Sequence, residues 1–307
     1  MMPKANWRDF VKRTKLMNQT RTGKFPIGFR RGGSEWQCDL QGVLSFAKAN
    51  QFAGLDVGAV DPSDLRAVIA AGLRIGTVDL KNYTAMVSAD ARKRKAAAQE
   101  NAAYIRSCVS AGAKTFFVLI IPEEPAKPRP DNFRLAVDGW GQLAAAIGPL
   151  GARLAIEGWP GPQNSALACT PADYRAFLKE MPPQVGVNFD PSHLIRMGID
   201  PVRSLPEFAP RVYHVHGKDT ELLDDELQEH GHLQNATFAK AHGCGEWCWR
   251  YAIPGHGCVR WGKLFSILQG AGYQGMVSVE LEDENFNGST AGEQEGLIAA
   301  REFLSHV

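Results

Sequence analysis

Four short, mostly apolar and β-prone segments of this chain each end at a side chain that can bind metal or move a proton. Their terminal residues are Glu157, Asp190, His216 and Glu280. In an α/β barrel, residues at the carboxyl ends of the strands line the mouth, where the chemistry takes place. We therefore expect these four side chains to meet at one end of such a barrel.

Three carboxylates and one imidazole have the chemistry of a divalent metal site. Oxygen donors favour hard ions such as Mn²⁺ or Mg²⁺, and a single nitrogen donor makes Co²⁺ or Zn²⁺ less favoured alternatives. The sequence therefore predicts one divalent ion, with Mn²⁺ preferred. For Asp190, which precedes Pro191, the alternative interpretation is that its side chain only caps a turn.

Polar residues next to His216 extend the predicted site. His214 shares a strand face with His216 but lies deeper, so we expect it to be a buried supporting residue. Lys218 and Asp219 follow at the barrel mouth, where we expect them to bind substrate or to orient Glu280. A plain ion pair between Lys218 and Asp219 is the alternative.

The elements that must position these residues alternate between short β-prone runs and longer helical patterns. Strands are expected over residues 26–30, 53–57, 75–80, 115–121, 153–157, 185–190, 212–216 and 276–280. Helices are expected over residues 40–50, 62–71, 89–111, 132–147, 170–181, 261–270 and 292–305. These ranges amount to about eight βα units. Joined by right-handed crossovers, they predict a closed (β/α)8 TIM barrel.

Two segments lie outside this alternation. Residues 1–24 predict an arm or helix in front of a single barrel domain that spans residues 25–307. Residues 220–259, after the seventh strand, are too many for a simple βα loop and are rich in aromatic residues, so we expect a lid. Within it, Arg250 is expected to bind substrate, with a surface salt bridge or aromatic stacking as the alternatives.

Composition narrows the classes of function. The formal net charge is +1, with both signs scattered along the chain, so we expect no nucleic-acid or membrane-surface partner. No apolar run is long enough to span a membrane, and the first residues lack the apolar core of a secretory signal. The six dispersed cysteines suit a reducing compartment, so a cytoplasmic protein is expected.

Several motifs, taken in their order along the chain, carry a family resemblance. They are Ile156-Glu-Gly158, Asn188-Phe-Asp-Pro-Ser-His-Leu194, His214-Val-His-Gly-Lys-Asp219, Trp249-Arg-Tyr-Ala-Ile-Pro-Gly255 and Tyr273-Gln-Gly-Met-Val-Ser-Val-Glu-Leu-Glu-Asp283. From Phe25 onward the chain resembles the sugar phosphate isomerase/epimerase branch of the xylose isomerase-like TIM barrels, which includes D-tagatose 3-epimerase and 3-keto-glycoside epimerases.

The resemblance implies roles for individual residues. It implies that the four strand-end side chains hold the metal, that Glu157 and Glu280 also transfer protons, and that His193 binds a substrate hydroxyl. The implied activity is isomerisation or epimerisation of a keto-sugar or keto-glycoside through a metal-stabilised cis-enediolate. An arginine that usually follows the metal-binding histidine in these epimerases is missing here, and Arg250 is the candidate to replace it.

Other functions are compatible with parts of the pattern. A lyase that eliminates across a 3-keto-glycoside would use the same metal and the same carboxylate base. An endonuclease IV-like phosphodiesterase would need additional histidines on the second and third strands, which end without one. A non-catalytic sugar-binding subunit would not need the complete donor set. A small-molecule sugar is the expected partner, and homodimer formation is left open.

Overall fold

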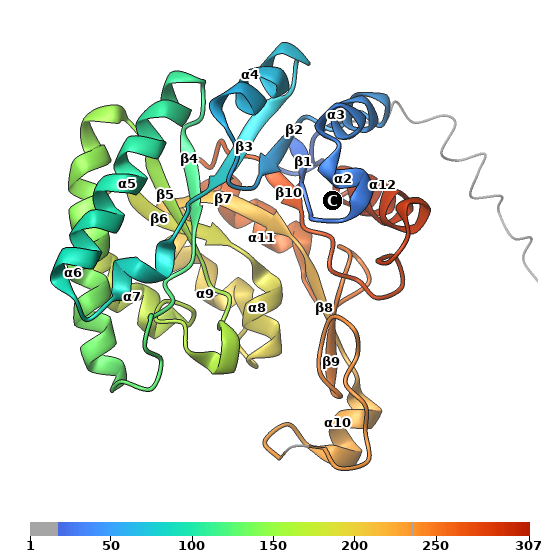
Figure 1. Cartoon of the computed structure of the whole chain (residues 1–307). Helices are drawn as coiled ribbons and strands as arrows, with labels where there is room; N and C mark the ends of the chain where they lie inside the picture. Colours follow the sequence, from blue (N-terminus) through green and yellow to red (C-terminus); the bar gives the residue numbers. More distant parts are fainter. Residues whose placement is uncertain (1–17, 235) are drawn as a thin grey trace, which may run out of the picture.

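Eight parallel strands close into a barrel in the computed structural model, which describes residues 18–234 and 236–307 (Figure 1). Around the barrel the order is β1-β10-β7-β6-β5-β4-β3-β2. The strands are β1 Ile27–Arg30, β2 Gly54–Val57, β3 Arg74–Asp79, β4 Thr115–Val118, β5 Arg153–Glu157, β6 Val185–Phe189, β7 Val212–Gly217 and β10 Val277–Val279. The expected barrel and its strand order along the chain are confirmed.

Helices surround the barrel on the outside. They are α2 Glu35–Cys38, α3 Leu40–Ala49, α4 Pro62–Ala70, α5 Ala91–Ser110, α6 Arg129–Ile147, α7 Pro171–Glu180, α8 Pro191–Arg196, α9 Pro201–Phe208, α11 Trp261–Gly270 and α12 Thr290–Ser305, with α10 Asp224–His230 apart from the barrel. Short 3₁₀ turns cover Tyr83–Val87, Gly148–Leu150, Pro162–Asn164 and Ala209–Arg211. Each expected helix is present with ends that shift by at most a few residues.

Burial of apolar side chains between the barrel and its helices holds the fold together. Every residue of β2 and β6 is buried, as expected for strands of a parallel barrel that are covered on both faces. Trp140 of α6 and Trp261 of α11 are each almost fully buried against this core. The packed core therefore fixes the strand ends that carry the polar residues.

Helix starts show how local sequence directs the chain at the barrel mouth. Thr170 forms a full capping box with Asp173 at the start of α7. Asp61 stands at the N-cap of α4 but makes no side-chain cap hydrogen bond there. Helices α8 and α9 were not expected, and each begins with an aspartate whose side chain accepts a backbone N–H two residues on.

The segment expected to form a lid builds an arm, which we define as residues 219–252. Strands β8 (Asp219–Leu222) and β9 (Trp249–Ala252) pair antiparallel in a sheet of their own. The arm projects away from the barrel, with α10 near its outer end (Figure 1). Tyr251 at the base of the arm contacts His193 at the barrel mouth. Covering of the site by the outer residues stays a prediction.

Residues 1–17 of the expected N-terminal arm lie outside the described residues. Among the helices of the described chain, none combines the length and hydropathy needed to cross a bilayer.

Candidate functional site

Four side chains from separate strand ends meet inside the barrel mouth. The Nδ1 atom of His216 lies 2.6 Å from Oε1 of Glu157 and 3.3 Å from Oε2 of Glu280. Oδ2 of Asp190 lies 4.0 Å from the same nitrogen. One donor atom from each of the four residues lies within 4.8 Å of the donor atoms of the others. The four residues predicted as metal ligands are therefore neighbours.

Asp190 uses its two carboxylate oxygens differently. Oδ1 accepts hydrogen bonds from the backbone N–H of Ser192 at 2.9 Å and from its hydroxyl at 2.6 Å, which caps α8. Oδ2 is buried and makes no hydrogen bond within residues 18–234 and 236–307, although Nζ of Lys218 lies 3.3 Å away. A buried carboxylate oxygen without a hydrogen-bond donor is costly, and a bound cation would remove that cost. Oδ1 thus caps the turn, while Oδ2 is placed where a cation could bind.

The charges of this group of residues fit a divalent cation. Three carboxylates share the space with one imidazole and with the ammonium of Lys218, which is itself buried. A dication together with Lys218 would balance the three negative charges and leave the imidazole neutral, as a metal ligand requires. The donor set is rich in oxygen, which suits a hard or borderline ion. This group is a candidate metal-binding cluster.

Two basic side chains hold Glu280. Nζ of Lys218 donates to Oε2 of Glu280 at 2.6 Å and to Glu282 at 2.8 Å. On the other side, Nε of Arg30 lies 3.1 Å from Oε1 of Glu280, while its terminal nitrogens form a bidentate pair with Asp79. Burial acts to raise the pKa of Glu280, but Lys218, His216 and Arg30 lower it well below its ordinary value of 4.5. Glu280 is therefore held as a carboxylate.

Glu157 and His216 shift each other's pKa values. Burial and the charge of Glu280 act to raise the pKa of Glu157, but the nearby imidazoles of His216 and His193 outweigh them and lower it to about 2. Burial acts to lower the pKa of His216, and the carboxylates of Glu280 and Glu157 raise it well above 6.5. Asn188 also donates to Oε1 of Glu157 at 3.2 Å. Without a bound cation, His216 supplies the positive charge that these carboxylates need.

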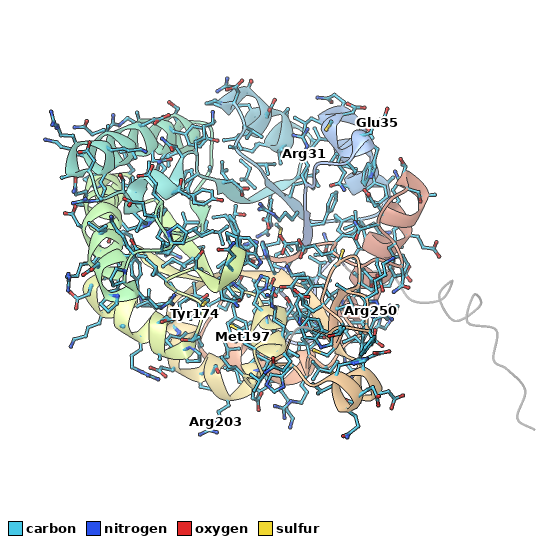
Figure 2. The ribbon with its side chains drawn as sticks, turned by 60° about the horizontal axis from the view of Figure 1, so that its bottom comes forward. Arg31, Glu35, Tyr174, Met197, Arg203 and Arg250 are labelled. Carbon is cyan, nitrogen blue, oxygen red and sulfur yellow. The ribbon has the colours of Figure 1, made fainter. Side chains whose placement is uncertain are left out.

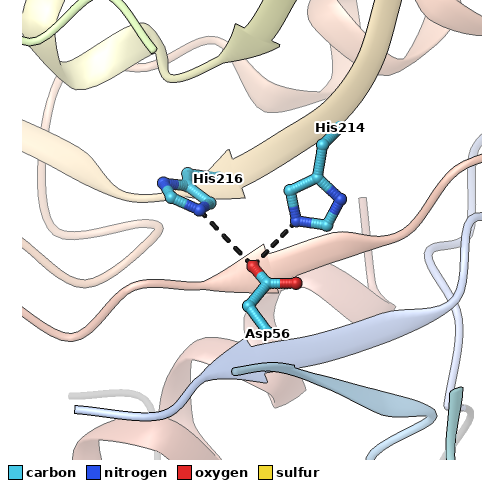
Figure 3. Close-up of side chains that lie close together, drawn as sticks. All are labelled: Asp56, His214 and His216. Carbon is cyan, nitrogen blue, oxygen red and sulfur yellow. Dashed lines mark hydrogen bonds and ion pairs between the residues drawn. The ribbon is translucent and has the colours of Figure 1, made fainter. Parts of the chain in front are cut away.

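A second group of polar residues supports His216 from behind. Oδ2 of Asp56 lies 2.8 Å from Nε2 of His214 and 3.4 Å from Nε2 of His216 (Figure 3). All three residues are buried, and Oδ1 of Asp56 accepts the backbone N–H of Thr77 at 2.9 Å. Phe117 stacks on the imidazole of His216 with ring centroids 5.6 Å apart. His214 is therefore a buried neighbour of the cluster, as expected from its position on β7.

His193 contacts the arm on one side and the cluster on the other. Its Nδ1 lies 2.7 Å from the hydroxyl of Tyr251 on β9. Its Nε2 lies 3.4 Å from Oδ2 of Asp190 and 3.8 Å from Oε1 of Glu157, and it makes no hydrogen bond to any residue that the structure describes. The structure thus places an unpartnered imidazole nitrogen beside the candidate metal ligands.

Asp219 lies at the start of the arm, and its side chain has different partners from that of Lys218. Its carboxylate accepts backbone N–H groups of Thr220, Gly255 and Val259 and the indole N–H of Trp261. Burial raises the pKa of Asp219, and these hydrogen bonds act in the opposite direction. These contacts join the start of the arm to residues 255–261 that follow it, and Lys218 forms its ion pairs with other residues.

Arg250 lies on β9 of the arm (Figure 2). Its Nε lies 2.7 Å from Glu221, and its Nη1 lies 2.6 Å from Glu284. Glu284 also contacts His242 and accepts the backbone N–H of Gly243. The described contacts of Arg250 therefore tie the arm to the segment after β10 and do not reach the four clustered residues.

Three neighbours of the cluster were missed in the sequence. Arg30 and Asp56 both stand at the end of a predicted strand. This is the same pattern that identified the carboxylates, so it could also have identified these two residues. Tyr251 reaches His193 only because β9 folds back along β8. That contact spans 58 residues of sequence and depends on the arm, which gave no recognisable strand pattern.

Comparison with curated proteins gives partial matches. The chain is 30% identical over 152 residues to YfiH, an uncharacterised protein of Bacillus subtilis (strain 168), with 48% of this chain and 46% of that protein covered. It is 31% identical over 120 residues to an inosose dehydratase of Bacillus thuringiensis (strain Al Hakam), with 39% and 37% covered. These matches span less than half the length of either relative.

Solved structures with similar folds extend over almost the whole chain. A 3-keto-D-glucoside 4-epimerase from E. coli aligns with a TM-score of 0.64 at 16% identity, covering 90% of this chain and 98% of that one. A D-psicose 3-epimerase aligns with a TM-score of 0.65 at 17% identity, covering 89% and 96%. At these identities the likeness shows the fold alone. The sequence profile described as the xylose isomerase-like TIM barrel matches residues 45–306, and the chain therefore belongs to that family.

Proposed function

We propose that this chain is a divalent-metal-dependent isomerase or epimerase of a keto-sugar or keto-glycoside. The observation that carries the proposal is the convergence of four donor side chains, from four strand ends, within 4.8 Å of one another. Catalytic groups of barrel enzymes come from the ends of several strands in this manner. Membership of the xylose isomerase-like family supports the same conclusion.

The cluster of Glu157, Asp190, His216 and Glu280 would hold the ion, for which we propose Mn²⁺, with Mg²⁺, Co²⁺ and Zn²⁺ as alternatives to be tested. When bound, the ion would supply positive charge to a carbonyl oxygen and a neighbouring hydroxyl of the substrate, which acidifies the C–H between them. The protein contributes the orientation of the ligands. Asp56 and Ser192 do this by contacting His216 and Asp190.

Two carboxylates are available to move the proton. Glu157 ends β5 and Glu280 follows β10, and strands β7 and β6 separate the two in the barrel. They approach the site from different sides, so one carboxylate can remove a proton from one face of a carbon while the other returns it to the opposite face. Lys218 holds Oε2 of Glu280, and Asn188 holds Oε1 of Glu157.

Substrate recognition in this proposal begins with His193. Its free Nε2 faces Asp190 and Glu157, so a substrate hydroxyl bound near the ion would come within its reach. Lys218 lies close enough to orient both the substrate and Glu280. We propose that Asp219 and Arg250 act on recognition indirectly, by fixing the arm whose β9 carries the partner of His193. A near-neutral net charge argues against a polyanionic partner.

A lyase is the second candidate. The curated relatives include inosose dehydratases, whose name describes loss of water from a cyclic keto-polyol. Such a reaction also begins with proton removal beside a carbonyl, and the same carboxylates could perform it. The two candidates differ in whether a leaving group departs after that step.

One experiment tests both candidates. The full chain loaded with Mn²⁺ is incubated with free and glycosylated keto-sugars and with a cyclic keto-polyol in deuterated buffer, and products are followed by proton NMR after the ion is removed. Deuterium incorporation with inversion supports the epimerase, and loss of water or of an aglycone supports the lyase. Glu157→Gln should abolish either change, while Glu180→Gln, on the exposed end of α7, should not. No exchange with any substrate in this set would contradict the proposal.

A further inference from the structure

The hydroxyl of Tyr251 joins the arm to the site through two hydrogen bonds. Nη1 of Arg196 donates to it at 2.8 Å, and Nδ1 of His193 lies 2.7 Å from it. Tyr251 is buried, and among the described residues no other group hydrogen-bonds its hydroxyl. The direction of each bond can therefore be worked out from the hydrogens available.

A guanidinium has only donors, so Tyr251 must accept the bond from Arg196. The hydroxyl then has one hydrogen of its own, and Nδ1 of His193 is the acceptor in reach. If Nδ1 carried a hydrogen instead, the tyrosine oxygen would accept twice and its own hydrogen would be buried without a partner, which is unfavourable. The bonds are complete only when Tyr251 donates to Nδ1.

The other end of the imidazole agrees with this direction. Nε2 of His193 lies 3.4 Å from Oδ2 of Asp190 and 3.8 Å from Oε1 of Glu157, which are both acceptors. An Nε2–H facing these oxygens is favourable, whereas a bare nitrogen lone pair would face negative charge. This Nε2 has no hydrogen-bond partner in the described chain, so its hydrogen is available to another acceptor.

Packing on the arm fixes the geometry of Tyr251. The guanidinium of Arg196 lies over the ring of Trp249 at 4.3 Å, and the rings of Trp249 and Tyr251 are 4.9 Å apart. Nζ of Lys218 lies over the ring of Tyr251 at 4.4 Å. The ring is therefore held by contacts that do not involve its hydroxyl, so a phenylalanine can replace it without a change of packing.

We infer that Tyr251 is a positioning residue that fixes His193 as the neutral tautomer with its hydrogen on Nε2, aimed at a substrate oxygen. Because Arg196 donates to the hydroxyl oxygen of Tyr251, the hydroxyl hydrogen points to Nδ1 of His193. The arm thereby supplies part of the recognition machinery. The tautomer follows from the hydrogen bonds alone, and only its use toward a substrate oxygen rests on the proposed function.

The tautomer can be read by NMR without substrate or metal. The full chain is labelled with ¹⁵N-histidine in the presence of a chelator, and two-bond ¹H–¹⁵N correlations report which ring nitrogen is protonated. His193 is assigned from the signals lost in His193→Gln and, independently, in His193→Asn. We expect an unprotonated Nδ1 and a protonated Nε2. A hydrogen on Nδ1, or on both nitrogens, would overturn the inference.

Variants make the test specific to the hydroxyl. Tyr251→Phe should move the His193 signals toward a mixture of the two neutral tautomers, and unchanged signals would overturn the inference. Tyr104→Phe is the matched control, because its hydroxyl also makes two hydrogen bonds, both to Val60, and lies in a different part of the fold. It should leave His193 unchanged.

Activity supplies an independent measurement. For a substrate that the protein turns over, Tyr251→Phe should lower kcat/KM by roughly tenfold, the effect of one hydrogen bond to a neutral partner. The change in kcat/KM is measured on a variant that urea unfolding shows to be folded under the assay conditions. An unchanged kcat/KM would contradict the role toward substrate. Failure to find any substrate would leave the NMR result standing, so the two ideas fail separately.

Discussion

The ammonium of Lys218 lies 2.6 Å from Oε2 of Glu280 and 3.3 Å from Oδ2 of Asp190 within the barrel mouth. Burial acts to lower the pKa of Lys218, but Asp190, Glu280 and Glu282 raise it well above 10.5, so the side chain is held as a cation. One fixed positive charge thus sits among the acidic ligands.

Replacing that charge should destabilise the metal-free protein. Lys218→Met leaves Glu280 and Asp190 without their ammonium partner, and removing one member of a buried ion pair typically costs about 3–5 kcal/mol of the free energy of unfolding. Urea denaturation in the presence of chelator measures the loss. Added Mn²⁺ should restore more stability to the variant than to the wild type. Lys263→Met, on the exposed face of α11, is the control, and an equal response of both variants to Mn²⁺ would contradict the charge argument.

Removing the ion should lower the free energy of unfolding by an amount set by the concentration of the ion relative to its dissociation constant. A ligand that binds only the folded state at 100 times its dissociation constant adds about 2.7 kcal/mol to the free energy of unfolding. Chelator should remove this increment from the wild type and change nothing in Asp190→Asn, which loses the unpartnered carboxylate oxygen. Identical unfolding curves of the wild type with and without Mn²⁺ would show that the cluster binds no such ion.

Asp56 should tune metal affinity without touching the ion. Its carboxylate contacts the rear nitrogens of His214 and His216, and loss of such supporting partners typically weakens metal binding by roughly 10–100-fold. Asp56→Asn keeps the shape and removes the charge. Titration calorimetry with Mn²⁺ gives the affinity, with Asp225→Asn on exposed α10 as the reference. Wild-type affinity in Asp56→Asn would mean that this carboxylate only fills the core.

The contribution of the contact between the arm and Glu284 to the stability of the fold should decrease at acidic pH. Backbone donation by Gly243, Arg250 and His242 lower the pKa of Glu284 from 4.5 to about 2. A carboxylate with a depressed pKa stabilises the folded state above its unfolded value, and this contribution is lost as the pH falls from about 4.5 to about 2.

The measurement is the difference in urea midpoint between the wild type and Glu284→Gln. It should be largest above pH 5 and shrink toward zero near pH 2. Glu229→Gln, at an exposed position of α10, should show no such trend. A difference that grows as the pH falls would reverse the sign and disprove the assignment.

Much of the barrel could be predicted because its signals are local. β5 and α11 have the bounds expected from the sequence, since apolar β-prone runs and helical periodicity each report directly on burial. Helices α8 and α9 escaped prediction because they are short, and Asp190 before Pro191 was also compatible with a simple turn.

The neighbourhood of the candidate site was predictable only where a residue ends a strand. The same rule that placed Glu157 beside His216 applies to Arg30 and Asp56, and it was not extended to them. The contact of Tyr251 with His193 depends on how β9 returns along β8, and no periodic pattern encodes such a return over so short a strand. Long-range contacts of an irregular insertion follow from packing, which a single sequence does not display.

The separation of the arm from the barrel sheet has a consequence for how such a protein diversifies. β8 and β9 hydrogen-bond only to each other as strands, so the eight-stranded ring closes without them. Insertions, deletions or grafts between Leu222 and Trp249 can accumulate without removing any hydrogen bond between the barrel strands. The outer arm can thus change in length and sequence while the eight-stranded barrel and the donors inside it stay as they are.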